Sequence, residues 1–212
     1  MTVHYRAAKN KKADSLSLWT EDLLSSRRFC SATTTTMDRL LKAQDTNTEQ
    51  HSFRSQEIAV QLAFNIGVPE SCVDSIRLLG RFHDIGKIGI PDSLLLKTEP
   101  LTTEEFQFIT KHSEIGYHIA LSLPEITHIA ELILKHHERW DGAGYPLKHK
   151  EEQIPIECRI MAIVDAYDSM TNDRPYRKAI SHDEAIEELQ RCAGSQFDPV
   201  LSQKFVELTM LK

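Results

Sequence analysis

Local signals for helix starts recur along this chain and constrain its fold more than any other feature. The segments 102–105 (TTEE) and 181–184 (SHDE) both match the capping box, in which a hydroxyl side chain and a glutamate three residues later satisfy free backbone N–H groups. Asp198-Pro199 indicates another start, because aspartate caps a helix and proline is tolerated at its first position. Each of these segments is expected to begin a helix.

Apolar residues return at spacings of three and four elsewhere in the chain, which is the helical period, and strand signals are scarce. Segments 88–91 and 141–154 have the composition of loops. The prediction is an all-α fold, a compact multi-helix bundle formed by residues 41–212, with residues 1–40 as an N-terminal appendage that serves docking or dimer formation. Further helices are expected at about 51–66, 70–85, 103–111, 113–122, 126–138 and 156–171.

Composition excludes several classes of protein. A length of 212 residues with 41% hydrophobic residues suits one domain with a real core. The net charge of -6 argues against binding polymeric nucleic acid, which needs a basic surface. No apolar run approaches the ~20 residues that span a bilayer, and the N-terminus lacks a signal-peptide pattern, so we expect a cytoplasmic protein without membrane insertion.

Histidine and aspartate residues of the types that bind metals recur in separate segments, at intervals of roughly 25 to 32 residues. Adjacent side chains on a helix point about 100° apart, so a His-Asp dipeptide does not chelate one ion as a tight pair. Its carboxylate can instead bridge two ions, and a His-His dipeptide can supply one imidazole to each. We therefore predict a metal-dependent hydrolase with a dinuclear site, built from His51, His83, Asp84, His112, His136, His137 and Asp165.

Two segments, 83–92 (HDIGKIGIPD) and 136–146 (HHERWDGAGYP), closely resemble the signature of the HD-GYP family, a branch of the HD phosphohydrolases. The resemblance runs from about residue 45 to residue 205, and it implies that residues 41–212 are an HD-GYP catalytic domain. It also implies that the donors named above are the metal ligands, that Asp84 bridges two ions, and that these ions are iron or manganese. The ligand types alone also accept zinc.

The activity that the resemblance implies is hydrolysis of cyclic di-GMP to pGpG, and in some members on to GMP. We expect a metal-bridging hydroxide to attack phosphorus, because paired ions lower the pKa of bound water and offset charge on the phosphate. Two alternatives stay open: a low-turnover module that binds cyclic di-GMP or docks a diguanylate cyclase (GGDEF) domain, and a phosphodiesterase for another cyclic dinucleotide such as cyclic GMP-AMP. Formation of a homodimer is also left open.

Substrate contacts are expected from a lysine, a tyrosine and two arginines. Lys87 lies three residues after Asp84, where helical geometry would place its ammonium group beside the site to assist catalysis and meet a phosphate oxygen. Tyr145 follows a glycine-rich turn and is expected to lie against the ligand. Arg174 and Arg177 resemble the family's cationic contacts to phosphate or guanine, with ion pairing to nearby Asp173 as the structural alternative.

The chain departs from the family pattern at three places. Asn47 replaces a glutamate that helps some relatives hold a third metal ion, so a two-metal site is predicted. Thr98-Glu99 replaces the more usual Pro-Gly, and residues 147–152 (LKHKEE) replace a glycine-containing loop. We therefore expect substrate access to differ from that of the relatives.

Overall fold

The computed structural model describes residues 46–173 and 177–210. Within these ranges the chain is helical and forms no strand. The described residues outside the helices pair only in isolated bridges, such as the bridge between Ala193 and Phe197. The all-α prediction is confirmed. The elements, with η for 3-10 helices, are α3 (Thr46–Ile66), α4 (Glu70–Phe82), η2 (Ile85–Gly89), α5 (Asp92–Leu95), α6 (Thr103–Thr110), α7 (His112–Leu121), η3 (Thr127–Ile129), α8 (Ala130–Lys135), η4 (Glu151–Gln153), α9 (Ile156–Thr171), α10 (His182–Arg191) and α11 (Pro199–Thr209).

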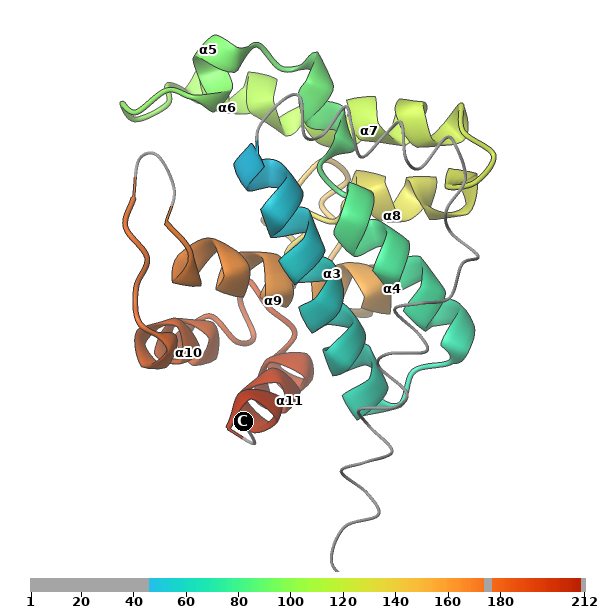
Figure 1. The fold of residues 1–212 in the computed structure, drawn as a ribbon, viewed down its shortest axis with the longest axis vertical. Coiled ribbons are helices and arrows are strands. Elements are labelled where there is room, and N and C mark those ends of the chain that lie inside the picture. The colour runs from blue at the N-terminus through green and yellow to red at the C-terminus, as the bar shows by residue number, and fades with distance from the viewer. Residues whose placement is uncertain (1–45, 174–176, 211–212) are drawn as a thin grey trace, which may run out of the picture.

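Helix α3 lies at the centre of the molecule and packs against α4 and α9 (Figure 1). One cluster of buried apolar side chains joins α3 and α9 to α10 and α11, and it includes Leu62 and Phe205. A second cluster joins α4 to α7, α8 and α9, and it includes Leu79 and Ile133. Because α9 contributes to both clusters, it ties the two halves of the core together.

The predicted helix starts are confirmed. Thr102 and Ser181 each accept a hydrogen bond from the backbone N–H three residues later, and both capping boxes are complete. The Asp198 carboxylate caps α11 by accepting from the N–H groups of Val200 and Leu201. These motifs act over three residues and need no tertiary contact, which is why they can be identified in the sequence.

The helix expected at 70–85 ends earlier than predicted, at Phe82, and the chain continues as η2. We attribute this change from α-helix to 3-10 helix to close packing at Gly86. A Cβ atom at Gly86 would lie 1.9 Å from the carbonyl oxygen of His112 and 2.5 Å from the N–H nitrogen of Gly116, so backbone meets backbone where η2 crosses α7. The 3-10 helix brings the Gly86 backbone against the backbone of α7. The spacing of apolar residues in the sequence does not reveal such a contact.

Two further segments differ from their expected form. The helix expected at 126–138 is divided into η3 and the shorter α8, and it stops before the histidine pair. Segments expected to be loops contain η2 and η4, and α5 was not predicted. The predicted appendage, residues 1–40, lies outside the described residues.

Among the residues that the structure describes, no helix is both long and apolar enough to cross a membrane.

Candidate metal centre

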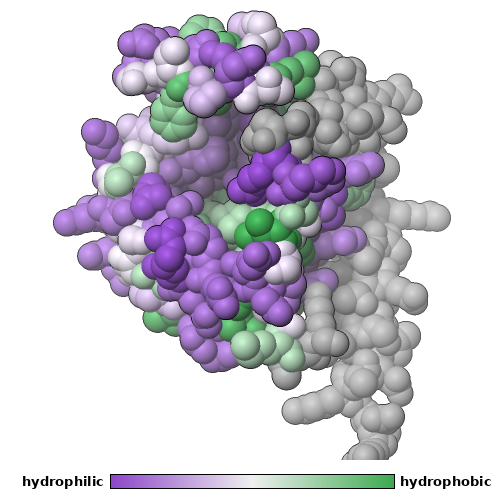
Figure 2. All heavy atoms as spheres, turned by 90° about the vertical axis from the view of Figure 1, so that its left-hand side faces the viewer, coloured by the Kyte–Doolittle hydropathy of each residue, from purple (hydrophilic) through white to green (hydrophobic). Residues whose placement is uncertain are grey.

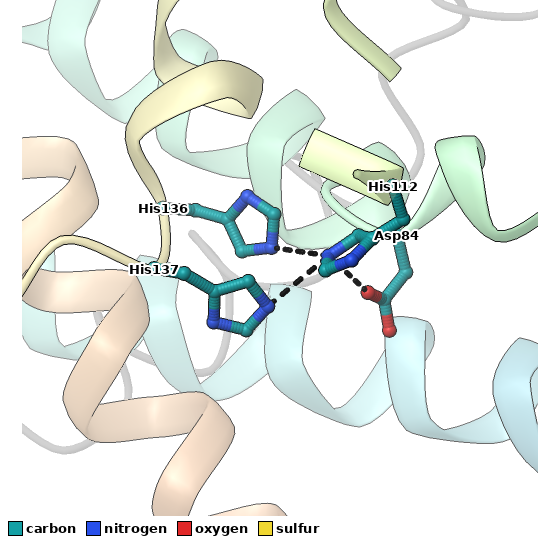
Figure 3. A group of neighbouring side chains, drawn as sticks. All are labelled: Asp84, His112, His136 and His137. Carbon is teal, nitrogen blue, oxygen red and sulfur yellow. Dashed lines mark hydrogen bonds and ion pairs between the residues drawn. The ribbon is translucent and has the colours of Figure 1, made fainter. Parts of the chain in front are cut away.

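The structure brings all of the predicted donor residues together in two adjoining groups, although they come from distant parts of the chain. Within each group the ligand atoms lie within 4.8 Å of one another. The first group is drawn in Figure 3 and comes from the segment after α4, the start of α7 and the end of α8. The second group spans α3, the end of α4 and α9. The members are Asp84, His112, His136 and His137 in the first group, and His51, His83 and Asp165 in the second.

Backbone carbonyl groups orient three of the imidazoles. The Nδ1 atom of His83 donates to the carbonyl oxygen of Gly80 at 3.2 Å, and those of His112 and His136 donate to carbonyls at 2.8 and 2.6 Å. In each case the carbonyl belongs to the residue three positions earlier. A carbonyl oxygen can only accept, so Nδ1 carries the hydrogen and Nε2 is the nitrogen that each ring turns into the group. This is the tautomer that a metal-binding histidine needs.

The Nε2 atoms of the first group converge on His112. His112 Nε2 lies 3.4 Å from His136 Nε2 and 3.1 Å from His137 Nε2 (Figure 3). Burial, followed by the neighbouring imidazoles, holds the pKa of His136 well below its usual range and lowers that of His137 to about 3. Both rings are therefore neutral near pH 7. His112 and His136 both carry their hydrogen on Nδ1, so their Nε2 lone pairs face one another, and a cation between them would remove that repulsion. His137 Nε2 can instead donate to His112 Nε2 when no metal is bound.

Asp84 connects the two groups. Its Oδ1 atom lies 3.6 Å from His112 Nε2, in the first group, whereas Oδ2 lies 3.4 Å from His83 Nε2, in the second. Burial alone would raise the pKa of this carboxyl, but the charges of Lys87 and His83 hold it well below its usual range. Asp84 is thus an ionised, buried carboxylate that presents one oxygen to each group, as a bridging ligand does.

Lys87 lies beside the cluster. Its Nζ atom is 2.5 Å from Asp84 Oδ2, and its side chain keeps 27% of its surface exposed. The 3-10 helix η2, rather than a continued α-helix, places it there. The ammonium group therefore contacts the donor cluster and the solvent at the same time.

One acidic residue that supports the cluster was not predicted. Asp168 is buried on α9 and accepts from His51 Nδ1 at 2.6 Å. Its carboxylate also accepts from Arg54 Nε at 2.6 Å and from a terminal Arg54 nitrogen at 2.9 Å. Because a carboxylate only accepts, His51 carries its hydrogen on Nδ1 and turns Nε2 toward Asp165, 3.2 Å away. The three-residue spacing of Asp165 and Asp168 on one helix was the available signal.

The charge of these carboxylates acts on His51. Burial lowers the pKa of a histidine, but Asp165 and Asp168 outweigh it and raise the pKa of His51 to about 9. Without a metal, His51 is therefore protonated near neutral pH. A cation that binds at Nε2 takes the place of this proton, so metal binding releases it.

The loop that follows the histidine pair is held in place from within the protein. Glu138 is buried, and one of its oxygens accepts from the N–H groups of Leu147 at 2.7 Å and Lys148 at 3.1 Å. Gly144 is packed so tightly that a Cβ atom there would lie 2.5 Å from the backbone nitrogen of Arg139. Glu138 was not predicted as a functional residue, although it directly follows the His-His pair. It sets the path of the loop that carries Tyr145.

Tyr145 lies against the first group. Its ring centroid is 4.9 Å from that of His137 and 6.5 Å from that of His112. The ring is tilted by 35° to His137 and nearly perpendicular to His112. Tyr145 therefore forms one wall of the donor cluster.

The structure describes one of the two predicted arginines. Arg174 lies outside the described residues. Arg177 is exposed and donates to the carbonyl oxygen of Ser169 at 2.6 Å, near the end of α9. Asp173 pairs with Lys178, at 2.9 Å.

Comparison with known proteins identifies the family. A family model described as "HD domain" matches residues 21–201. The chain is 38% identical over 174 residues to the cyclic di-GMP phosphodiesterase of Thermotoga maritima, a match that covers 81% of this chain and 47% of that protein. This chain belongs to the HD-GYP family. The HD-GYP chain spans about half the length of this curated relative.

Two other comparisons are informative. The HD-GYP chain is 35% identical over 169 residues to the 3'3'-cGAMP-specific phosphodiesterase 2 of Vibrio cholerae, covering 79% of this chain and 32% of that protein. Its fold resembles the crystal structure of a cyclic GMP-AMP specific phosphodiesterase from V. cholerae, with a TM-score of 0.63 at 18% identity. That likeness covers 82% of this chain and 47% of the other. The second comparison supports the HD fold alone.

Proposed function

We propose that this HD-GYP domain is a metal-dependent phosphodiesterase that hydrolyses cyclic di-GMP to pGpG in the cytoplasm, with GMP as a further product to be tested. The observation that carries the proposal is the position of Asp84, whose two carboxylate oxygens face different groups of imidazole donors. The 38% identity to a cyclic di-GMP phosphodiesterase supports the choice of substrate.

The donor set fits two divalent ions. Each group offers imidazole nitrogens with a carboxylate oxygen, and Asp84 is shared between them. Imidazole and carboxylate donors suit iron and manganese, which we propose as the metals, and they also accept zinc. Two such ions, when bound, lower the pKa of water and offset the negative charge of a phosphodiester.

The chain's own residues supply the rest of the chemistry. Lys87 already contacts Asp84, so its partly exposed ammonium group can donate to a phosphate oxygen without leaving the cluster. Tyr145 forms a wall on which the ligand rests. We retain Arg174 and Arg177 as candidate contacts to phosphate or guanine; Arg177 is exposed and uses one terminal nitrogen on Ser169.

A second candidate substrate is cyclic GMP-AMP. The 35% identity to a 3'3'-cGAMP-specific phosphodiesterase favours it, and that match covers 79% of this chain, close to the 81% of the cyclic di-GMP phosphodiesterase match. The two substrates share the phosphodiester ring and differ in one purine. A comparison of the two substrates on one preparation therefore separates these candidates.

The decisive experiment pairs metal analysis with product chromatography. Protein purified without added ions is expected to hold two metal equivalents and to convert cyclic di-GMP to pGpG. Asp84→Asn keeps the shape of the side chain but removes its charge, and it is expected to lose metal and most of the turnover. Asp74→Asn changes an exposed carboxylate on α4 and serves as the control.

The outcomes separate the alternatives. Equal turnover by wild type and Asp84→Asn would refute the bridging role. Saturable binding of cyclic di-GMP without pGpG would identify a low-turnover receptor instead of an enzyme. Size-exclusion chromatography of the same protein, with and without a diguanylate cyclase (GGDEF) domain, tests docking of that partner and formation of a homodimer.

A further inference from the structure

Helix α6 carries an aromatic ring at the edge of the donor cluster. The ring of Phe106 makes an edge contact with Tyr145, with centroids 6.2 Å apart and planes at 87°. Tyr145 in turn lies 4.9 Å from His137. A row of rings therefore runs from the donor cluster outward to Phe106, which keeps 51% of its surface exposed.

The core does not account for the position of this ring. No residue of α6 is buried, and Phe106 belongs to neither apolar cluster. The helix is nevertheless held in place, because its capping box is complete and Lys97 pairs with Glu105 at 2.6 Å. On the face drawn in Figure 2, the surface is hollowed below the uppermost layer, to which α5 and α6 belong (Figures 1 and 2). An ordered helix thus presents an unburied ring beside the cluster.

A cyclic dinucleotide offers what such a ring can bind. Its purines are joined to the phosphates through ribose, so a base lies outward from a phosphate held at the metals. Stacking of a base on an aromatic side chain contributes about 1 to 3 kcal/mol. A single exposed phenylalanine is ordinary on a protein surface, but Phe106 is in ring contact with Tyr145, which forms the wall of the donor cluster.

We propose that Phe106 stacks on a purine of the cyclic dinucleotide and so determines affinity for purine-containing substrates over small phosphodiesters. This inference rests on the proposed function. Phe106 acts on binding of the base, whereas the donor cluster acts on the phosphate. Loss of the ring is therefore expected to change KM and to leave metal content and kcat near wild-type values.

Phe108 provides a matched control. It lies on the same helix and is 39% exposed, but its ring faces Lys111, whose Nζ atom is 5.2 Å from the ring centroid. Two residues along an α-helix correspond to about 200° of rotation, so the two rings point in different directions. Phe106→Ala and Phe108→Ala remove equal apolar groups from the same surface helix.

The experiment measures KM and kcat on cyclic di-GMP and on methyl p-nitrophenyl phosphate, which has no base. Phe106→Ala is expected to raise KM for cyclic di-GMP about 5- to 150-fold and to leave the small substrate unaffected. Phe106→Trp should restore the affinity, Phe106→Leu should not, and Phe108→Ala should match wild type. An unchanged KM in Phe106→Ala, equal behaviour of the Leu and Trp variants, or loss of metal would overturn the proposal.

Equilibrium binding of cyclic di-GMP separates this inference from the proposed function. Phe106-dependent binding by a wild-type protein that produces no pGpG would refute the phosphodiesterase and support stacking. Turnover with a Phe106-independent KM would refute stacking alone. Absence of both binding and turnover in wild type would refute both.

Discussion

The substitution Asp168→Asn tests how the protein orients His51, a predicted metal ligand whose Nδ1 atom donates to the Asp168 carboxylate. Four donor contacts converge on this carboxylate. Oδ2 receives His51 Nδ1 at 2.6 Å and a terminal Arg54 nitrogen at 2.9 Å, and Oδ1 receives Arg54 Nε at 2.6 Å and Asn172 Nδ2 at 3.1 Å. An asparagine side chain has one oxygen and one NH2 group. Whichever way it turns, its NH2 group faces two donors, and two of the four bonds are lost.

The magnitude follows from this geometry. Loss of the partner that orients a metal-binding histidine typically weakens metal affinity about 10- to 100-fold, or about 1 to 3 kcal/mol. The two lost bonds also lower the free energy of unfolding of the metal-free protein, by about 2 to 4 kcal/mol. The lower part of that range is expected, because the Arg54 side chain is 36% exposed and can bind water instead.

Two measurements distinguish a role of Asp168 in orienting His51 from a purely structural role between α9 and α3. Competition against a chromophoric chelator gives the metal affinity, and urea unfolding of metal-free protein gives the stability. Asp168→Asn should weaken both, whereas the exposed control Asp74→Asn should change neither. If Asp168→Asn lost stability but kept wild-type metal affinity, Asp168 would only brace α9 against α3, and the reasoning about His51 would be refuted.

Three other predictions follow from buried groups. Glu138→Ala frees two loop N–H groups and should destabilise the protein by about 1 to 3 kcal/mol in urea and raise KM for cyclic di-GMP; an unchanged KM would separate the loop from the substrate. Gly86→Ala forces a methyl group against the backbone of α7, and a melting temperature equal to wild type would contradict the close approach. Metal-free protein should lose about 1 to 3 kcal/mol of stability between pH 7.5 and 5.5. His112, His136 and His137 have lowered pKa values, so each contributes a loss of stability as pH falls through 6.5. His51, with its pKa raised to about 9, contributes a gain that offsets about one of these losses. Urea titrations at both pH values check the sign, since higher stability at pH 5.5 would contradict it.

The sequence by itself determined the features that act over a few residues. The caps at Thr102, Ser181 and Asp198 were predictable because each hydrogen bond joins residues two or three positions apart. The all-α class followed from the apolar period. The donor residues could also be named in advance, because their chemical types recur in recognisable segments.

Only the tertiary structure decided how those residues work together. Asp168 and His51 are 117 positions apart, so no local pattern pairs them. The end of α4 depends on Gly86 meeting the backbone of α7, and that turn in the chain places Asp84 between the two donor groups. Local hydrogen bonds depend on neighbours in sequence, whereas the direction of a buried side chain depends on what packs against it from elsewhere in the chain.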